Sequence, residues 1–132
     1  RKEVILEIME NGIQIGLTGT SYEDRMLGSQ APKIRAIAIA DRDALPAKII
    51  ENISALMEVK SSMNVFVAAP TAGSCGALPG TLIALVIIKK KVHDELVRAL
   101  LAAGMIGVFI AEYATFAAEV AGCQAECGSG SG

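Results

Sequence analysis

Aromatic side chains are scarce in this chain of 132 residues. It has no tryptophan, two tyrosines and three phenylalanines, so aromatic residues make up 4% of the sequence. Hydrophobic residues nevertheless account for 52%, and the core must therefore be built from alanine and aliphatic side chains. Small aliphatic residues suit closely packed helices. The shortage of aromatics also leaves no platform on which nucleic-acid bases could stack.

No excess of either charge is present. Lys and Arg number 12 and Asp and Glu number 14, so the formal net charge is -2. A nucleic-acid partner would require a basic face, and we therefore expect none. The uncharged apolar runs over residues 75–88 and 99–111 are both shorter than the about 20 residues that cross a membrane. We expect buried core helices there and no membrane span.

Cysteine is also sparse, with three residues in the chain. An odd number does not suit a disulfide framework, and no signal peptide is recognisable from Arg1 onward. The sequence therefore predicts a cytoplasmic protein whose thiols are free or bound to a metal.

Apolar residues recur at helical spacing along most of the chain. Val4, Ile5 and Met9 share one face of the first predicted helix, and Ile50 and Leu56 share one face of the third. The pattern predicts helices over residues 1–15, 31–40, 46–63, 78–92 and 94–116.

Residues that break helices are concentrated between these segments. Glycine-rich loops are expected over residues 16–29, 70–76 and 123–130, and a short extended piece over residues 65–69. No internal repeat or low-complexity tract separates domains. The sequence thus predicts an all-α fold, a single helical bundle-like domain over residues 1–132 with glycine-rich loops at helix ends.

The three thiols offer one possible chemistry. Cys123 and Cys127 are four residues apart, and Cys75 lies in another glycine-flanked segment. Three thiolates from two loops could meet at one metal centre and leave a coordination position open for catalysis by iron or zinc. Alternatively, the cysteines act as small buried hydrophobes, and the spacing does not decide between the two interpretations.

The glycine-rich segments offer a second chemistry. Residues 73–76 and 128–130 each combine a serine with flanking glycines, an arrangement that exposes backbone N–H groups to an anion such as a carboxylate. Ordinary helix capping by serine is the alternative. Neither segment matches the phosphate-binding pattern G-x-x-x-x-G-K-[ST], so no nucleotide is expected.

Two motifs resemble a known family. They are "AAPTAGSCGALPGTL" at residues 68–82 and "GCQAECGSGSG" at residues 122–132, and the helical stretch between them is similar as well. They resemble the α-chain, or catalytic domain, of the bacterial iron-sulfur L-serine dehydratases. With "GLTG" at residues 16–19 the likeness covers most of the chain.

The resemblance implies conversion of L-serine to pyruvate and ammonia, with a [4Fe-4S] cluster as the Lewis acid that helps hydroxide to leave. Cys123 matches a cluster ligand of the family. The other two ligands follow in a Cys-Asp-Pro motif and a later cysteine, which do not occur before Gly132. The chain is therefore expected to be a partial α-chain, in which Cys75 and Cys127 are not cluster ligands.

The resemblance also guides the choice of substrate residues. We predict that Thr71, Gly73 and Ser74 hold the carboxylate of L-serine, with Ser129 and Ser131 as the second choice. No catalytic base is identified, because the single histidine lies in a charged turn. The partners that the family implies are a β-chain or β-domain and further copies of the chain in a homo-oligomer.

Two other functions remain open from the sequence. The chain could be a non-catalytic helical interaction module that keeps the family's core without its cluster. It could also belong to a related lyase that acts on cysteine or another small β-substituted amino acid.

Overall fold

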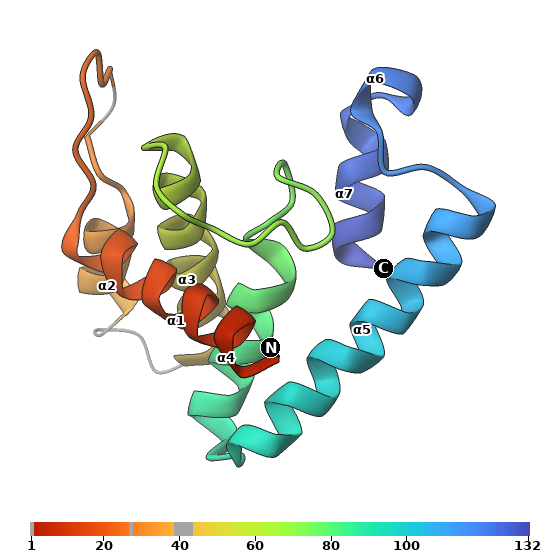
Figure 1. Cartoon of the computed structure of the whole chain (residues 1–132). Coiled ribbons are helices and arrows are strands. Elements are labelled where there is room, and N and C mark those ends of the chain that lie inside the picture. Colours follow the sequence, from red (N-terminus) through yellow and green to blue (C-terminus); the bar gives the residue numbers. More distant parts are fainter. Residues whose placement is uncertain (1, 27, 39–43) are drawn as a thin grey trace.

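The computed structural model describes residues 2–26, 28–38 and 44–132. Within these ranges the chain is helical and contains no strand, which confirms the all-α prediction (Figure 1). The helices are α1 (Lys2–Thr18), α2 (Ala31–Ala38), α3 (Ala44–Ser61), α4 (Ala77–Lys89), α5 (His93–Tyr113), α6 (Ala118–Ala121) and α7 (Cys123–Ser131).

Helices α1 and α3 form the centre of the core. The buried stripe of α1 consists of Leu6, Met9, Ile13 and Leu17, which recur every three or four residues and so lie on one face of the helix. At Gly16 a Cβ atom would lie 2.6 Å from the Cα of Ala55 in α3. Glycine is therefore what allows the two backbones to approach this closely.

Helix α4 packs on the other side of α3. A Cβ atom at Gly80 would lie 2.7 Å from Cγ1 of Ile53, so here too a glycine permits close contact between helices. The buried Asn52 donates a hydrogen bond of 3.2 Å from its Nδ2 to the carbonyl oxygen of Gly80. Ile83 and Ala84 of α4 complete the buried surface.

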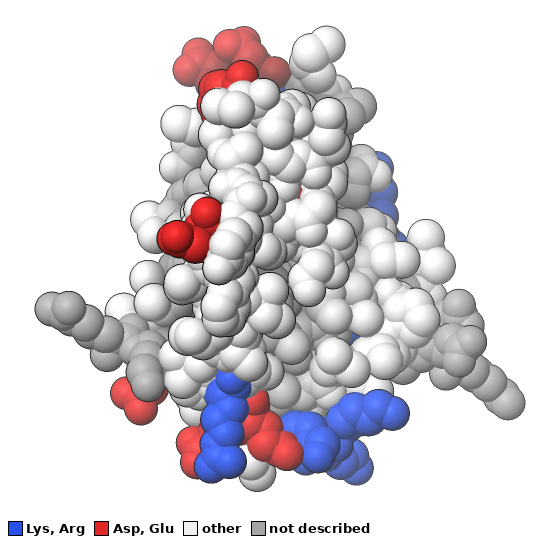
Figure 2. All heavy atoms as spheres, turned by 90° about the vertical axis from the view of Figure 1, so that its right-hand side faces the viewer, with Lys and Arg blue, Asp and Glu red and all other residues white. Residues whose placement is uncertain are grey.

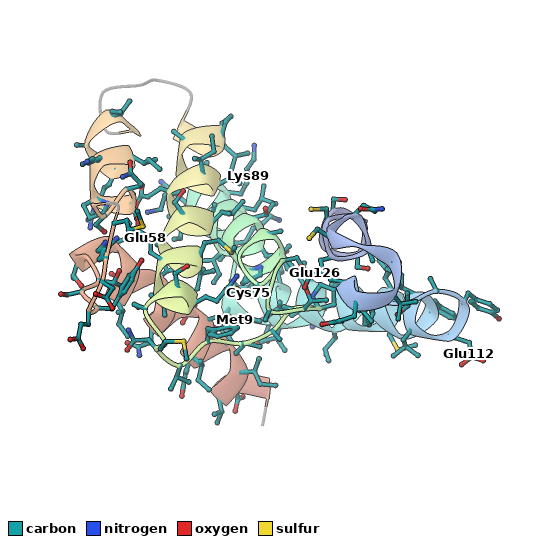
Figure 3. All side chains as sticks on the ribbon, turned by 90° about the horizontal axis from the view of Figure 1, so that it is seen from above. Met9, Glu58, Cys75, Lys89, Glu112 and Glu126 are labelled. Carbon is teal, nitrogen blue, oxygen red and sulfur yellow. The ribbon has the colours of Figure 1, made fainter. Side chains whose placement is uncertain are left out.

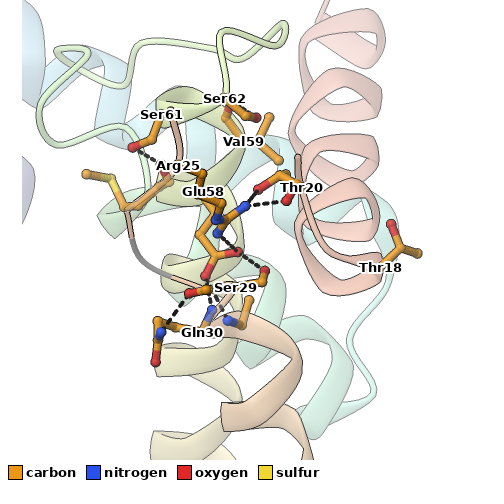
Figure 4. A network of polar contacts seen from close by, with 12 residues as sticks. Thr18, Thr20, Arg25, Ser29, Gln30, Glu58, Val59, Ser61 and Ser62 are labelled. Carbon is orange, nitrogen blue, oxygen red and sulfur yellow. Dashed lines mark hydrogen bonds and ion pairs between the residues drawn. The ribbon is translucent and has the colours of Figure 1, made fainter. Parts of the chain in front are cut away.

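A carboxylate fixes the segment between α1 and α2 to the core. The hydroxyl of Ser29 and the backbone N–H groups of Gln30 and Ala31 donate hydrogen bonds to Glu58 of α3, and the guanidinium of Arg25 lies 3.7 Å from the same carboxylate (Figure 4). Glu58 thus satisfies the N–H groups at the start of α2, which have no partner inside that helix.

Helix α5 leaves this core. Its first turn packs on the other helices through Leu96, its one buried residue, and the helix then runs outward to α6 and α7 (Figure 1). Helix α7 returns toward the start of α4 and the loop before it. The chain therefore has a packed body, α1 to α4, and an arm that carries α7 back to it.

The predicted helices agree with the observed ones to within a few residues at their ends. Positions 39 and 40 of the predicted helix 31–40 lie outside the described residues. Residues 65–69, where a short extended piece is predicted, lie in an irregular segment between α3 and α4 and form no strand.

The predicted loop over residues 123–130 is wrong, since this segment belongs to α7. Gln124, Ala125 and Glu126 favour a helix, and Gly122, with φ 75°, turns the chain into it. The glycines that suggested a loop lie in the second half of α7, where Gly130 serves a close contact described below.

Candidate functional site

The loop before α4 is organised by two hydroxyl groups. Ser74 donates its backbone N–H to Oγ1 of Thr71 at 3.2 Å, and the two side-chain oxygens are 2.9 Å apart and share a hydrogen bond. The carbonyl oxygen of Ser74 then accepts the N–H of Ala77, the first residue of α4. The predicted residues Thr71 and Ser74 therefore lie together, in a turn that leads into a helix.

Helix α7 binds this loop through Glu126. The N–H of Gly73 donates a hydrogen bond of 3.2 Å to Oε1 of Glu126, which is 53 positions further along the chain. A Cβ atom at Gly73 would lie 2.5 Å from Cδ of the same carboxylate, so a larger residue would push it away. Figure 3 shows Glu126 between α7 and the helices of the body. The loop thus binds a carboxylate through a backbone N–H group.

A second contact lies one turn further along α7. A Cβ atom at Gly130 would lie 2.8 Å from Cβ of Ser74 and 3.2 Å from its Oγ. Because Glu126 and Gly130 are four residues apart, they lie on the same face of α7. The two motifs of the sequence therefore meet side by side, and this contact explains the glycine at position 130.

Cys123 is the first residue of α7, and its thiol is free and exposed. It precedes Glu126 by three positions and so lies one turn away on a neighbouring part of the same helical surface. Gly130, which touches Ser74, is about 10 Å further along the helix axis at 1.5 Å per residue.

The other two thiols are in different surroundings. Cys75 is buried, and its Sγ lies 3.9 Å from the sulfur of Met57; burial raises the pKa of this thiol above its ordinary value. Cys127 is exposed on α7. Among the described residues, no three or more His, Cys, Asp or Glu side chains gather closely enough to hold a metal ion. Two of the three thiols, those of Cys123 and Cys127, are thus exposed on α7, and the third is buried.

The second-choice substrate residues have other partners. Ser129 donates its hydroxyl to the carbonyl oxygen of Ala125 at 2.7 Å, and Ser131 donates its hydroxyl to Gly128 at 3.3 Å. Both hydroxyls are therefore engaged within α7. Both residues also line a separate, mainly apolar cleft between α4, α5 and α7, of which Thr71 and Ser74 are not part.

Glu126 is the site residue whose role sequence reasoning missed. A glutamate in a glycine-rich segment is usually solvated, and only the contact with Gly73 distinguishes it. Its position within "GCQAECGSGSG" was the available signal. The single histidine, His93, is exposed at the start of α5, at the end of that helix away from α7 (Figure 1).

A comparison with models of protein families shows to which family the chain is related. The family model described as "Serine dehydratase alpha chain" matches residues 1–132. The chain belongs to this family. No solved structure matches the chain significantly.

Three relatives illustrate the similarity. The "Probable L-serine dehydratase, alpha chain" of Bacillus subtilis (strain 168) is 35% identical over 130 residues, which cover 96% of this chain and 43% of that protein. The "L-serine dehydratase, alpha chain" of Peptoniphilus asaccharolyticus is 42% identical over 85 residues, or 64% of this chain and 29% of the relative. The "Probable L-serine dehydratase, alpha chain" of Latilactobacillus sakei is 40% identical over 82 residues, or 62% of this chain and 39% of the relative. The chain thus spans less than half the length of each.

Proposed function

We propose that this chain is the part of an L-serine dehydratase α-chain that binds the substrate carboxylate. The proposed reaction eliminates water from L-serine, and hydrolysis of the resulting aminoacrylate gives one molecule each of pyruvate and ammonia. Membership of the family and the names of the relatives support this function. The observation that carries it is the hydrogen bond between Gly73 and Glu126, because it joins the two family motifs around a carboxylate-binding N–H group.

In this proposal the loop before α4 recognises L-serine. The N–H of Gly73 donates to the substrate carboxylate, and the hydroxyl groups of Thr71 and Ser74, 2.9 Å apart, supply further hydrogen bonds. A backbone N–H together with hydroxyl groups is a common way to hold an anion without a basic side chain. The carboxylate of Glu126 already accepts the hydrogen bond from the Gly73 N–H. The substrate carboxylate must therefore displace Glu126 or bind beside it.

We further propose that Cys123 supplies one ligand of a [4Fe-4S] cluster. Its exposed thiol lies on α7 near Glu126, but the remaining ligands must come from residues outside this chain. When bound, such a cluster supplies a Lewis acid for the departing hydroxyl group. A β-chain and further α-chains are the proposed partners.

The test uses the complete α-chain with its β-chain, prepared without oxygen, and measures pyruvate formed from L-serine. Thr71→Val removes one hydroxyl from the loop, and we expect the KM for L-serine to rise at least roughly fivefold, as the loss of one substrate hydrogen bond of about 1 kcal/mol predicts. Ser61→Ala is the matched control, because Ser61 is exposed at the end of α3 and bonds only its own helix.

Three outcomes would overturn parts of the proposal. An unchanged KM in Thr71→Val would remove this loop from substrate binding. Full iron and sulfide content with unchanged visible absorption in Cys123→Ser would remove Cys123 from the cluster. If the unmodified enzyme forms pyruvate faster from L-cysteine than from L-serine, or from neither, the proposed substrate is wrong.

A further inference from the structure

Helix α5 carries a stripe of exposed residues at heptad spacing. The stripe recurs alternately every three and four residues, so that its members lie on one side of the helix; it consists of Arg98, Leu101, Met105, Val108 and Glu112. All of them are exposed, Met105 by 57% and Val108 by 60%. We call this stripe the α5 seam. Its three inner residues are apolar, and its two ends are charged.

The α5 seam faces away from the packed body. Leu100 and Gly107, which line the cleft between α4, α5 and α7, point about 140° and about 160° away from Met105 around the helix at 100° per residue. Figure 2 looks at the side on which α5 lies in Figure 1 and shows a wide, mostly uncharged area between charged side chains at the top and the bottom of the view. A partner can therefore approach the seam without entering the cleft.

The seam is symmetric about Met105 in length and opposite in charge at its two ends. Residues 99–111 carry no charge, and Arg98 and Glu112 lie equally far before and after Met105. In an antiparallel pair of such helices with Met105 on the two-fold axis, each residue faces the one that lies equally far on the other side of Met105 in the second copy. Arg98 of each copy then faces Glu112 of the other. A parallel pair would bring like charges together instead.

Neither charged end belongs to an ion pair within the described part of the chain, where the pairs are Arg25–Glu58, Lys48–Glu51 and Lys91–Glu95. Arg98 has Glu95 as an electrostatic neighbour one turn earlier, but Glu95 itself pairs with Lys91. Arg98 and Glu112 are about 21 Å apart along the helix at 1.5 Å per residue. They are therefore too distant to pair with each other in one copy.

A second copy is the partner that fits this pattern. The apolar middle could be covered by any apolar surface, because the hydrophobic effect is not directional. The ends require more, namely an acid and a base at matching separation and in reversed order. Helix α5 of another copy supplies both by symmetry, so that one sequence satisfies the two sides of the interface at once. A lipid bilayer or an uncharged helix would leave both charged ends without partners.

We propose that two copies of this chain associate through their α5 seams, antiparallel, with Met105 on the two-fold axis and Arg98 of each copy paired with Glu112 of the other. Exposed ion pairs stabilise little, so the apolar middle supplies most of the affinity and the charges select direction and register. The proposal names the surface by which the further α-chains suggested above would bind. It does not depend on the proposed reaction, and its test requires no catalytic turnover.

Chemical cross-linking tests the register directly. The variant Arg98→Lys keeps the positive charge and introduces a primary amine, which a carbodiimide joins to a carboxylate that is in contact with it. Because residues 98 and 112 of one copy are about 21 Å apart, a link between them can form only between copies. The test uses the complete α-chain with its β-chain, and mass spectrometry of the digested protein identifies the linked peptides.

We expect Arg98→Lys to give a link between residues 98 and 112 that is absent when Glu112→Gln is added. The native pair of Lys91 and Glu95, at 3.2 Å, should be linked in every sample and shows that the reagent has worked. Arg35→Lys, at an exposed position of α2, is the matched control and should give no link to Glu112.

Charge reversal supplies a second measurement. Arg98→Glu alone, or Glu112→Arg alone, makes both pairs between the copies repulsive, and we expect the dissociation constant of the α-chains in sedimentation equilibrium to rise at least roughly fivefold. In an equal mixture of the two variants the opposed charges attract again, and we expect a dissociation constant within about twofold of the unmodified one. Arg35→Glu and Glu3→Arg make the same charge changes at exposed positions elsewhere and should have no such effect.

Four results would overturn the proposal. The first is no link between residues 98 and 112 in a sample in which Lys91 and Glu95 are linked. The second is a link from residue 98 to the β-chain or to another part of the α-chain instead, which would assign the seam to that partner. The third is an unchanged dissociation constant in both charge-reversal variants, which would place the association on another surface. The fourth is flotation of the enzyme with phosphatidylcholine vesicles and no link, which would assign α5 to a membrane, since it can cross one by length and composition.

Discussion

The backbone N–H of Gly73 and the carboxylate of Glu126 are joined by a hydrogen bond of 3.2 Å across 53 positions of the chain. This contact and the adjacent one between Ser74 and Gly130 bring α7 to the loop before α4. Cys123 is placed relative to the loop by the same helix. The geometry of the candidate site therefore depends on how firmly α7 is held.

Gly73→Ala tests this dependence. The new methyl group would overlap the Glu126 carboxylate, so we expect α7 to shift away from the loop and its amide hydrogens to exchange several-fold faster in hydrogen–deuterium exchange. Gly128→Ala is the control, because no heavy atom lies within 4 Å of a Cβ at that position and alanine favours a helix over glycine. Equal exchange in the two variants would show that Gly73 does not hold α7.

Gly16→Ala should destabilise the core. Its methyl group would lie 2.6 Å from the Cα of Ala55, an atom of the α3 backbone that cannot rotate away. We expect the free energy of unfolding to fall by about 1–3 kcal/mol, the usual cost of overpacking, as measured by urea denaturation. The comparison is Gly104→Ala on α5, where the space is open and a gain of up to about 1 kcal/mol is expected from helix propensity. A neutral Gly16→Ala would contradict the close packing of α1 on α3.

The Glu58 network should make stability depend on pH. Burial is the largest influence on this carboxyl and raises its pKa, but the hydrogen bonds from Ser29, Ala31 and Gln30 and the charge of Arg25 together hold the pKa below its ordinary value of 4.5. Because the folded pKa is the lower one, the stabilisation is fully present above the unfolded pKa and is lost as pH falls through the folded pKa.

Glu58→Gln removes this charge. At pH 7 we expect the free energy of unfolding to fall by about 1–3 kcal/mol, as for lost hydrogen bonds to a charged group, and the difference from the unmodified chain to shrink below the ordinary carboxyl pKa. Glu112→Gln, at an exposed position of α5, should change little at either pH. A Glu58→Gln effect that is the same at pH 7 and at strongly acid pH would rule out a contribution from the charge.

The sequence predicted the helices well but not which side of each helix packs. Helical spacing puts Val4 and Ile5 on one face with Met9, yet they are 54% and 45% exposed, while Met9 is 4% exposed and Leu6 is fully buried. Helix α1 is apolar on more than one side, so periodicity alone predicts a helix without identifying its partner. Only the close approach at Gly16 selects the side that packs on α3.

Helix α3 also shows that apolar periodicity does not identify which residues are buried. Helical spacing puts Ile50 on one face with the buried Leu56, yet Ile50 is 53% exposed, whereas Glu51 and Asn52 are buried. Lys48 pairs with Glu51 at 2.8 Å, and Asn52 bonds Gly80. These partners offset part of the cost of burial, whereas Oδ1 of Asn52 is buried without a hydrogen-bond partner among the described residues. Hydrophobicity along one segment does not reveal such partners.

The sequence identified the two motifs of the candidate site, but it did not predict that they contact each other. Thr71, Gly73, Ser74 and Cys123 followed from the family resemblance. The hydrogen bond between Gly73 and the chain's own Glu126 depends on the path of α5. The segment of α7 resembles a loop in sequence because it contains Gly128 and Gly130, of which Gly130 packs against Ser74. Long-range geometry of this kind is not encoded in local propensity.

The long arm formed by α5 has a consequence for the order of events in folding. Helix α5 extends for about 32 Å at 1.5 Å per residue and has one buried residue, whereas α1, α3 and α4 share a continuous core. The core can therefore assemble before α7 reaches the loop, and α7 can detach again while the core stays intact, as partial unfolding units do. The candidate site between α7 and the loop before α4 would then open by release of the arm alone, with the rest of the fold in place.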